Sequence, residues 1–255
     1  MSNGVNLMNA LTQVSDSLSL FFIAGAALLL ALTQGFGRRG LSTISDLIIP
    51  VGIIGALTGL IGMLGNMSDI KAIPSALFIV MTVFLYSLVI RWLIGEQQQT
   101  AELDSDLKFK LAGYAGLMLL ITWNMTNVGE LDYFIHAEAV LFVACTIGLL
   151  AGRNLIAKQP AFTGLQQKLV SLGLFGFLLG LALMLNTIDN PKGLGPSMAF
   201  GYLSLYYALL VLLTLRIFAP DNSDVSSTTW QSLGLPFLLG ATASISILLL
   251  SLSYT

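Results

Sequence analysis

The fold of this chain is set by a stretch that occurs twice in the sequence. The first copy reads Pro50-Val-Gly-Ile-Ile-Gly-Ala-Leu-Thr-Gly-Leu-Ile-Gly-Met-Leu-Gly-Asn-Met-Ser-Asp-Ile-Lys-Ala-Ile-Pro-Ser75, and the second occupies residues 172–197. An ungapped alignment pairs three glycines and one lysine, and one inserted residue then pairs a Pro-Ser dipeptide. The pairs are Gly52 with Gly173, Gly55 with Gly176, Gly59 with Gly180, Lys71 with Lys192, and Pro74-Ser75 with Pro196-Ser197. This agreement indicates an internal duplication.

The composition is that of a membrane protein. The 255 residues are 56% hydrophobic and 9% charged, with a mean hydropathy of +0.86, which leaves too few polar side chains to cover a soluble globule. We therefore expect the chain to lie in a lipid bilayer. A net charge of -2 without a basic stripe argues against nucleic-acid binding. The lone Cys145 excludes a disulfide framework and a thiolate metal cluster.

Eight apolar runs are long enough to cross a hydrocarbon core of about 30 Å as helices. They cover residues 18–34, 47–67, 73–94, 109–125, 134–151, 169–188, 194–218 and 233–253. The polar segment 96–110 is either a solvated extension of the preceding helix or a linker between the two halves, and the linker is preferred. The expected fold class is therefore an all-α, polytopic membrane protein with about eight transmembrane helices.

The loop charges predict the orientation of these spans. Nine basic residues fall on one side of the membrane, and two, Lys71 and Lys192, fall on the other. The nine are Arg38, Arg39, Arg91, Lys108, Lys110, Arg153, Lys158, Lys168 and Arg216. The positive-inside rule then puts both termini outside the cytoplasm. Four spans per half make the copies parallel, in a first repeat at 1–130 with its hairpin at 47–94 and a second at 131–255 with its hairpin at 169–218.

The candidate functional residues are the small and polar residues of the two hairpins. Glycines four residues apart share one helix face, which either packs closely against another helix or borders a pore. Polar side chains within the spans are few, and Glu138 is the nearest to an intramembrane acid, although it also fits a side chain that reaches the membrane surface. The hairpin candidates are Gly52, Gly55, Ala56, Thr58, Gly59, Thr82, Gly173, Gly176, Phe177, Gly180 and Ser204.

Catalysis is not expected from this sequence. One histidine and one cysteine cannot assemble the usual hydrolytic or metal sites, and no glycine-rich loop is followed by Lys-Ser or Lys-Thr. We therefore expect no catalytic residue, no bound metal and no cofactor.

The segment Gly173-Leu-Phe-Gly-Phe-Leu-Leu-Gly180-Leu resembles the Gly-Leu-Phe-Gly-Thr-x-x-Gly-Ile signature of the MotA/TolQ/ExbB family. The segment Gly52-Ile-Ile-Gly-Ala-Leu-Thr-Gly59-Leu is a looser copy, and the turns that follow both segments are also similar to the family's outer turn. The resemblance implies an all-helical homo-oligomeric ring in a bacterial inner membrane, with both termini periplasmic. It also implies a single-span partner of the ExbD/MotB/TolR kind and the conversion of ion flow into force.

Two positions depart from the family pattern. The family has a pore threonine where this chain has Ala56 and Phe177, whereas Thr82 matches the polar position of the next helix, with Ser204 as its counterpart. Three functions therefore stay open. The first is a subunit of an ion-driven motor or force-transducing complex, the second a non-conducting membrane scaffold of the same ancestry, and the third a small-solute carrier built from parallel repeats.

The duplication also bears on assembly. If both signature helices lined one pore, whole chains would supply only an even number of units and could not form the five-unit ring that the resemblance implies. One repeat is therefore expected to face the centre and the other to pack outside, unless the ring has an even number of units or another protein joins it. We expect the first repeat inside, because Ala56 is small. Phe177 fills the matching place in the second repeat, where its ring suits a lipid-facing or subunit-packing surface.

Overall fold

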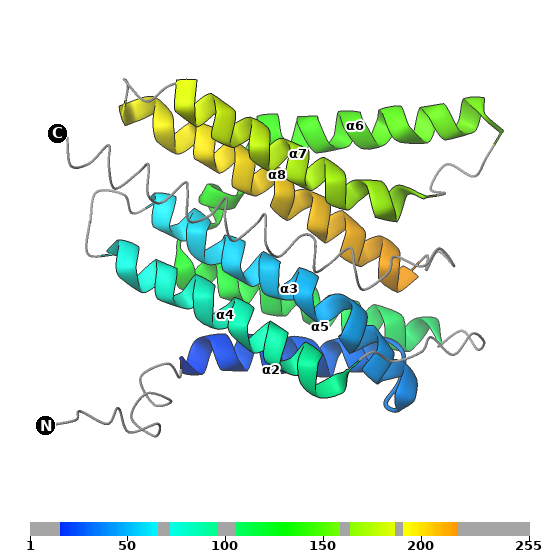
Figure 1. The fold of residues 1–255 in the computed structure, drawn as a ribbon. Helices are drawn as coiled ribbons and strands as arrows, with labels where there is room; N and C mark the ends of the chain where they lie inside the picture. Colours follow the sequence, from blue (N-terminus) through cyan, green and yellow to red (C-terminus); the bar gives the residue numbers. More distant parts are fainter. Residues whose placement is uncertain (1–15, 66–71, 96–105, 159–163, 187–190, 219–255) are drawn as a thin grey trace, which may run out of the picture. The chain divides into compact units, whose positions relative to one another are not determined.

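A computed structural model of the chain describes residues 16–65, 72–95, 106–158, 164–186 and 191–218. All regular structure in these ranges is helical, as Figure 1 shows. The elements are α2 (Ser17–Thr33), α3 (Arg38–Gly65), α4 (Ala72–Ile94), α5 (Leu107–Val128), the short 3-10 helix η1 (Leu131–Phe134), α6 (Ala137–Ile156), α7 (Leu165–Asn186) and α8 (Pro191–Phe218). The all-helical fold class is therefore confirmed for the described part of the chain.

Five of these helices are long and apolar enough to cross a membrane, judged by length and composition: α3, α4, α6, α7 and α8. The 17-residue α2 is apolar but shorter, and α5 does not reach the same hydropathy. Both coincide with expected spans. The expected span at 233–253 lies outside the described residues, and so does residue 255.

Two helix starts differ from the sequence prediction. We expected the second helix to begin at residue 47, but α3 begins at Arg38 and contains Pro50. Hydropathy detects only the apolar part of a helix, and the polar turns at residues 38–46 continue it. The expected linker 96–110 was wrong at its end, because α5 begins at Leu107 and includes Lys108 and Lys110.

The chain divides into two compact units. In the described ranges, the first unit contains α2, α4, α3 up to Gly59 and α5 up to Asn124. There α3 packs against α4, and α5 covers one side of α2, where a Cβ built on Gly116 would lie 2.6 Å from a methyl carbon of Leu29. These contacts place the first hairpin, α3 with α4, beside α2.

The second unit contains the remaining residues of α3 and α5, then η1, α6, α7 and α8. The second hairpin consists of α7 and α8, which pack against each other more extensively than any other helices of this unit, and α6 packs against both. Figure 1 shows α7 and α8 running side by side. Each unit therefore presents a glycine-bearing hairpin next to one preceding helix.

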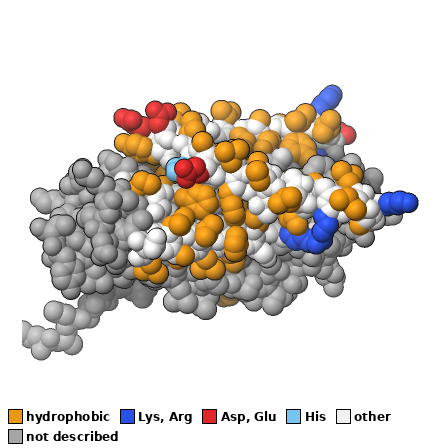
Figure 2. Space-filling model, turned by 90° about the horizontal axis from the view of Figure 1, so that it is seen from above, with side chains coloured by type: hydrophobic (Ala, Val, Ile, Leu, Met, Phe, Trp, Pro, Cys, Tyr) orange, Lys and Arg blue, Asp and Glu red, His pale blue; other side chains and the backbone are white. Residues whose placement is uncertain are grey.

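Charged side chains separate toward opposite ends of α6. Acidic residues lie just before it and in its first turn, whereas Arg153 lies in its last turn. Figure 2 shows one face with most of its Lys and Arg side chains at one end and acidic side chains with the histidine at the other. The basic end of α6 contains Arg153, one of the nine basic residues from which the orientation was predicted, and the orientation itself stays a prediction.

Candidate functional site

The glycine positions of the first hairpin leave no room for a side chain, because neighbouring helices lie against them. A Cβ built on Gly52 would lie 2.5 Å from the Cβ of Ser87 in α4. One built on Gly55 would lie 2.6 Å from Phe22 Cε1 in α2 and 2.9 Å from Val83 Cγ1 in α4. These separations are too short for real side chains, so the glycine face of α3 is occupied by helices of the same unit.

The glycines of the second hairpin are packed in the same way. A Cβ on Gly173 would lie 3.0 Å from the Cβ of Ala208 in α8. One on Gly176 would lie 2.6 Å from the Cβ of Ser204 in α8 and 2.9 Å from Phe142 Cε1 in α6. The glycines Gly52 and Gly55, and Gly173 and Gly176, thus lie at one helix crossing in each unit.

Gly180 makes the closest approach to the backbone of another helix among these positions. A Cβ built there would lie 2.4 Å from the Cα of Gly201, so the backbones of α7 and α8 touch directly. Because neither of the two facing glycines has a side chain, the helix backbones can come into van der Waals contact, as is common between transmembrane helices.

The contacts of the two hairpins correspond residue by residue. The partner of Gly52 is Ser87 and that of Gly173 is Ala208, and these partners are separated by the same offset as the glycines. The same offset relates Val83, which faces Gly55, to Ser204, which faces Gly176. The counterpart of Ser204 is therefore Val83, and the pairing of Ser204 with Thr82 was wrong because the one-residue insertion does not extend to the helix crossing.

Tyrosine hydroxyls of α4 and α8 join each hairpin to the start of the preceding helix. In the first unit the Tyr86 hydroxyl accepts a hydrogen bond from the backbone N–H of Asp16 at 3.3 Å. In the second unit the Tyr207 hydroxyl accepts one from the backbone N–H of His136 at 3.2 Å and donates one to the Phe134 carbonyl at 2.5 Å. Asp16 and His136 are the N-cap residues of α2 and α6, so the two contacts are equivalent.

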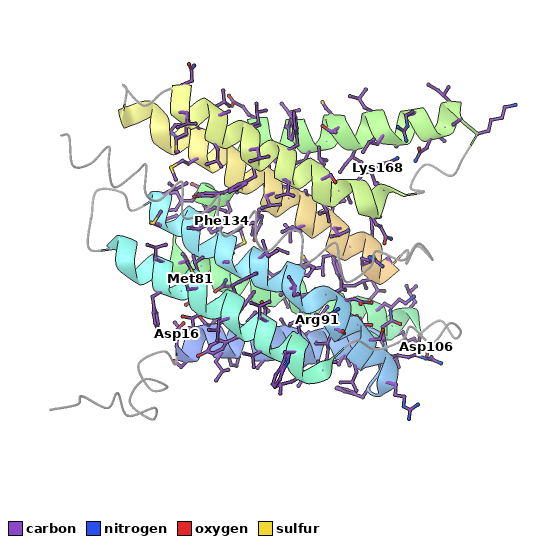
Figure 3. All side chains as sticks on the ribbon, in the orientation of Figure 1. Asp16, Met81, Arg91, Asp106, Phe134 and Lys168 are labelled. Carbon is purple, nitrogen blue, oxygen red and sulfur yellow. The ribbon has the colours of Figure 1, made fainter. Side chains whose placement is uncertain are left out.

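The two N-cap residues differ in whether their side chains bond to the first turn of the helix. The Asp16 carboxylate accepts a hydrogen bond from the backbone N–H of Ser19 at 3.0 Å, and such a bond satisfies one of the free donors of the first helical turn. The His136 side chain makes no capping bond, and its Nδ1 is buried without a hydrogen-bond partner. Figure 3 shows Asp16 at one end of its unit and Arg91 toward the other.

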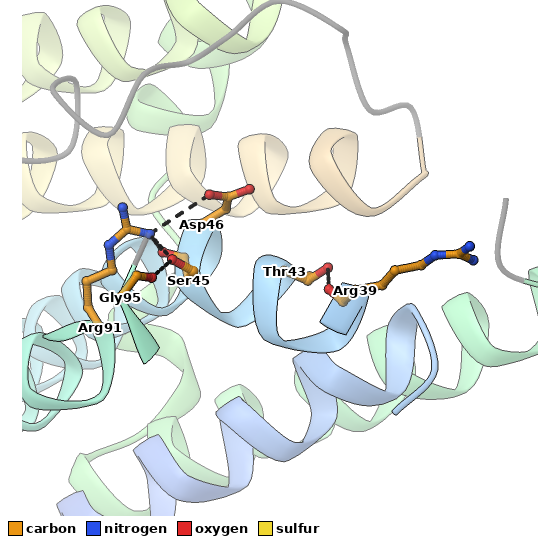
Figure 4. Close-up of polar contacts among 6 residues, drawn as sticks. All are labelled: Arg39, Thr43, Ser45, Asp46, Arg91 and Gly95. Atoms are coloured by element: carbon orange, nitrogen blue, oxygen red, sulfur yellow. Dashed lines mark hydrogen bonds and ion pairs between the residues drawn. The ribbon is translucent and has the colours of Figure 1, made fainter. Parts of the chain in front are cut away.

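The opposite end of the first hairpin is held by a charged cluster, drawn in Figure 4. The Arg91 guanidinium donates to the carbonyl and the hydroxyl of Ser45 and lies 3.9 Å from an oxygen of Asp46. The Ser45 hydroxyl donates to the Gly95 carbonyl at 2.8 Å. Because Ser45 and Asp46 lie in α3 while Arg91 lies in α4, the cluster ties the two helices together.

The corresponding end of the second hairpin has a weaker tie. Gln166 occupies the position that matches Ser45, and its side-chain N–H donates to the Leu215 carbonyl at 3.5 Å. Leu212 stands at the position that matches Arg91. The second hairpin therefore has a side-chain-to-carbonyl hydrogen bond at this end, with an uncharged residue at the position of Arg91.

The polar candidates mostly serve their own helices. The Thr58 hydroxyl donates to the Ile54 carbonyl at 2.9 Å, and the Thr82 hydroxyl donates to the Phe78 carbonyl. The Ser204 hydroxyl differs, because it is buried without a hydrogen-bond partner in the described structure. Glu138 is exposed in the first turn of α6, which fits a helix-end acid better than an intramembrane one.

The remaining candidates are also packed. Ala56 and Gly59 are buried in α3. Phe177 is 1% exposed, and its ring stacks on Tyr202 of α8 with centroids 5.7 Å apart. We expected Phe177 to face lipid or another subunit, and this was wrong for the side chain in its own unit, because the α8 aromatic ring offers it an interior contact.

Sequence reasoning missed the two tyrosines and the Arg91 cluster. Tyr86 and Tyr207 are separated by the same offset as Gly52 and Gly173, so extending the ungapped alignment into the next helix would have found them. The Arg91 cluster has no such signal, since its second-repeat equivalents are not charged. Within the described residues, no group of three or more His, Cys, Asp or Glu side chains could hold a metal ion.

Comparisons of this chain with protein-family models, with curated proteins and with solved structures gave no match. The resemblance to the MotA/TolQ/ExbB signature therefore rests on the quoted residues alone.

Proposed function

We propose that the chain consists of two parallel four-helix repeats, 1–130 and 131–255, with eight spans and both termini periplasmic in a bacterial inner membrane. The matched contacts of Gly52 with Gly173, Gly55 with Gly176 and Tyr86 with Tyr207 support a common origin of the two halves. The acidic start and basic end of α6 agree with the orientation given by the positive-inside rule.

For the function, we propose a non-conducting membrane scaffold of MotA/TolQ/ExbB-like ancestry that assembles with copies of itself and with a single-span partner. One observation carries this choice. The glycine faces of both hairpins, at Gly55 and Gly176 for example, are filled by helices of the same unit. A partner helix would have to displace these neighbours to line a pore there, and the threonine hydroxyls of this region already bond their own helices.

The test is ion flux through the complex as it is purified. The chain would be extracted in a mild detergent, the proteins that accompany it identified, and the whole complex reconstituted in liposomes that enclose a pH-sensitive dye. We expect a single-span protein in the complex and a proton flux no greater than that of empty liposomes. Flux that is abolished by Thr82→Val would contradict the scaffold function.

A second function, the subunit of an ion-driven motor or force-transducing complex, is favoured by Ser204. Its buried hydroxyl has no hydrogen-bond partner in the described residues and faces Gly176, and a buried polar group without a partner is costly unless another state uses it. In the flux assay this function predicts transport that falls with Ser204→Ala. The matched control is Ser87→Ala, because the Ser87 hydroxyl donates to the Phe84 carbonyl at 2.7 Å within its own helix.

A further inference from the structure

One apolar face of α6 is open. Cys145 is exposed, Leu149 is 74% exposed, and Arg153 follows on the same side of the helix. Beside this row, a Cβ built on Gly148 or Gly152 would meet nothing within 4 Å. By contrast, a Cβ built on Gly25, Gly116 or Gly176 would meet neighbouring atoms within that distance, and we call this uncovered face of α6 the open face.

The equivalent face of α2 is covered. The offset that pairs Phe22 with Phe142 pairs Gly25, Leu29 and Thr33 of α2 with Cys145, Leu149 and Arg153 of α6. In the first unit α5 lies on these α2 residues. The contacts are Gly113 on Thr33 and Leu29, Gly116 on Leu29, and Leu120 on Gly25. Thr33 is fully buried as a result, whereas the matching Arg153 is exposed.

We propose that residues 233–253 of this chain dock as a helix on the open face of α6, as α5 docks on α2. The inference rests on the duplication proposed above, in which this segment is the fourth helix of the second repeat. It goes further by naming the surface that the segment covers. The open face is thereby an intramolecular docking site, and neither lipid nor a partner protein occupies it.

The length of the chain beyond α8 fits this placement. α8 ends with Arg216 in its last turn, α6 ends with Arg153 in its last turn, and the 14 residues at 219–232 connect α8 to the segment. The segment then has 21 residues, enough for a helix of about 30 Å, which matches the hydrocarbon thickness. The first repeat uses the same design, with α4 ending at Ile94 and α5 beginning at Leu107.

The sequence of the segment offers the same contact pattern as α5. Gly113, Gly116 and Leu120 of α5 have the spacing of Gly240, Ala243 and Ile247. This alignment sets Ala243 against Leu149 and Ile247 against Cys145, where α5 sets Gly116 against Leu29 and Leu120 against Gly25. Small residues then meet large ones across the pair, which is the usual basis of close packing between transmembrane helices.

The native Cys145 makes the test direct. Ile247→Cys would be introduced into the full chain, oxidised in native membranes with copper phenanthroline, and scored by loss of both free thiols and by mass spectrometry of the linked peptides. A disulfide needs Cα atoms within about 7 Å of each other, so we expect an intramolecular bond. The matched control, Leu249→Cys on the opposite side of the same helix, should keep both thiols free.

Three results would overturn the inference. A disulfide-linked dimer of the unmodified chain through Cys145 would show that a second copy occupies the open face. A bond from Leu249→Cys in preference to Ile247→Cys would show that the opposite side of the segment docks. Free thiols in both variants, with Cys145 open to a lipid-soluble maleimide, would show that lipid covers α6.

A separate labelling experiment distinguishes failure of the proposed duplication from failure of the docking. In a Cys145→Ser background, a cysteine at residue 255 should react with an impermeant reagent from outside the cell. Reaction only from the cytoplasm would remove the eighth span and with it the two-repeat proposal. Reaction from outside without the disulfide would reject the docking alone.

Discussion

The two hairpins share their centres and differ at their ends. At the centre, Gly55 and Gly176 each meet a phenylalanine of the preceding helix and a residue of the following helix at matching positions. At one end Arg91 binds Ser45 near Asp46 in the first hairpin, whereas at the matching end of the second hairpin Leu212 replaces Arg91 and Gln166 donates to the Leu215 carbonyl. The comparison teaches that both units place a glycine against the corresponding pair of neighbouring helices at the crossing, while the polar contacts at the ends of the hairpins differ.

The largest effect is expected where backbones touch. Gly180→Ala sets a methyl group against the Gly201 backbone, which cannot move aside as a side chain does, and should destabilise the fold by about 3 kcal/mol. Gly55→Ala meets the side chains of Phe22 and Val83 and should cost about 1 kcal/mol. Unfolding by sodium dodecyl sulfate, followed by circular dichroism, measures both; equal losses would remove the distinction between the two crossings.

The charged cluster should matter more than its uncharged equivalent. Arg91→Gln removes the bonds to Ser45 and the attraction to Asp46, and because both charged groups are partly exposed the loss should be about 1.5 kcal/mol. Gln166→Leu loses one long hydrogen bond and should cost about 0.5 kcal/mol or less. The same unfolding assay at two salt concentrations is informative, since only the Arg91 variant should reduce the salt dependence of stability.

The tyrosine contacts to the two N-caps should rank by the length of their hydrogen bonds. Tyr207→Phe loses the bonds to the His136 N–H and the Phe134 carbonyl and should cost about 1 kcal/mol. Tyr86→Phe loses one longer bond to the Asp16 N–H and should cost about 0.5 kcal/mol. Amide hydrogen exchange at residues 16 and 136 provides the local measurement, and unchanged exchange at residue 136 in Tyr207→Phe would contradict the contact.

The smallest net effect, and a stabilising one, is expected from improving the N-cap of α6. His136→Asp gives α6 the capping residue that α2 already has, and should stabilise the chain by about 0.5 kcal/mol, since the acidic residues Asp132 and Glu138 nearby oppose part of the gain. Asp16→Ala should cost about 1 kcal/mol, because the N–H of Ser19 loses its acceptor. Thermal melting of the two variants at neutral pH tests whether the difference between the caps is energetic; a destabilised His136→Asp would show that it is not.

The helical positions were largely predictable. Each of the seven apolar runs within the described ranges coincides with a helix, because a chain in a bilayer must satisfy its backbone hydrogen bonds internally and long apolar runs do so as helices. The helix ends were less predictable. The first turns of α3, from Arg38, are polar, and hydropathy gives no signal for a helix that continues into water.

The sequence by itself determined the membrane class, the glycine positions and the spacing that relates Gly52 to Gly173, since these depend only on residue type and order. Tertiary structure decided which atoms meet those glycines, that Val83 and not Thr82 is the counterpart of Ser204, and that Phe177 stacks on Tyr202 in the interior. The reason is that the direction of a side chain rotates about the helix axis from one residue to the next. A one-residue shift turns a helix by about 100°, so an alignment that is correct to within one residue still leaves the facing side chain undetermined until the helices are packed.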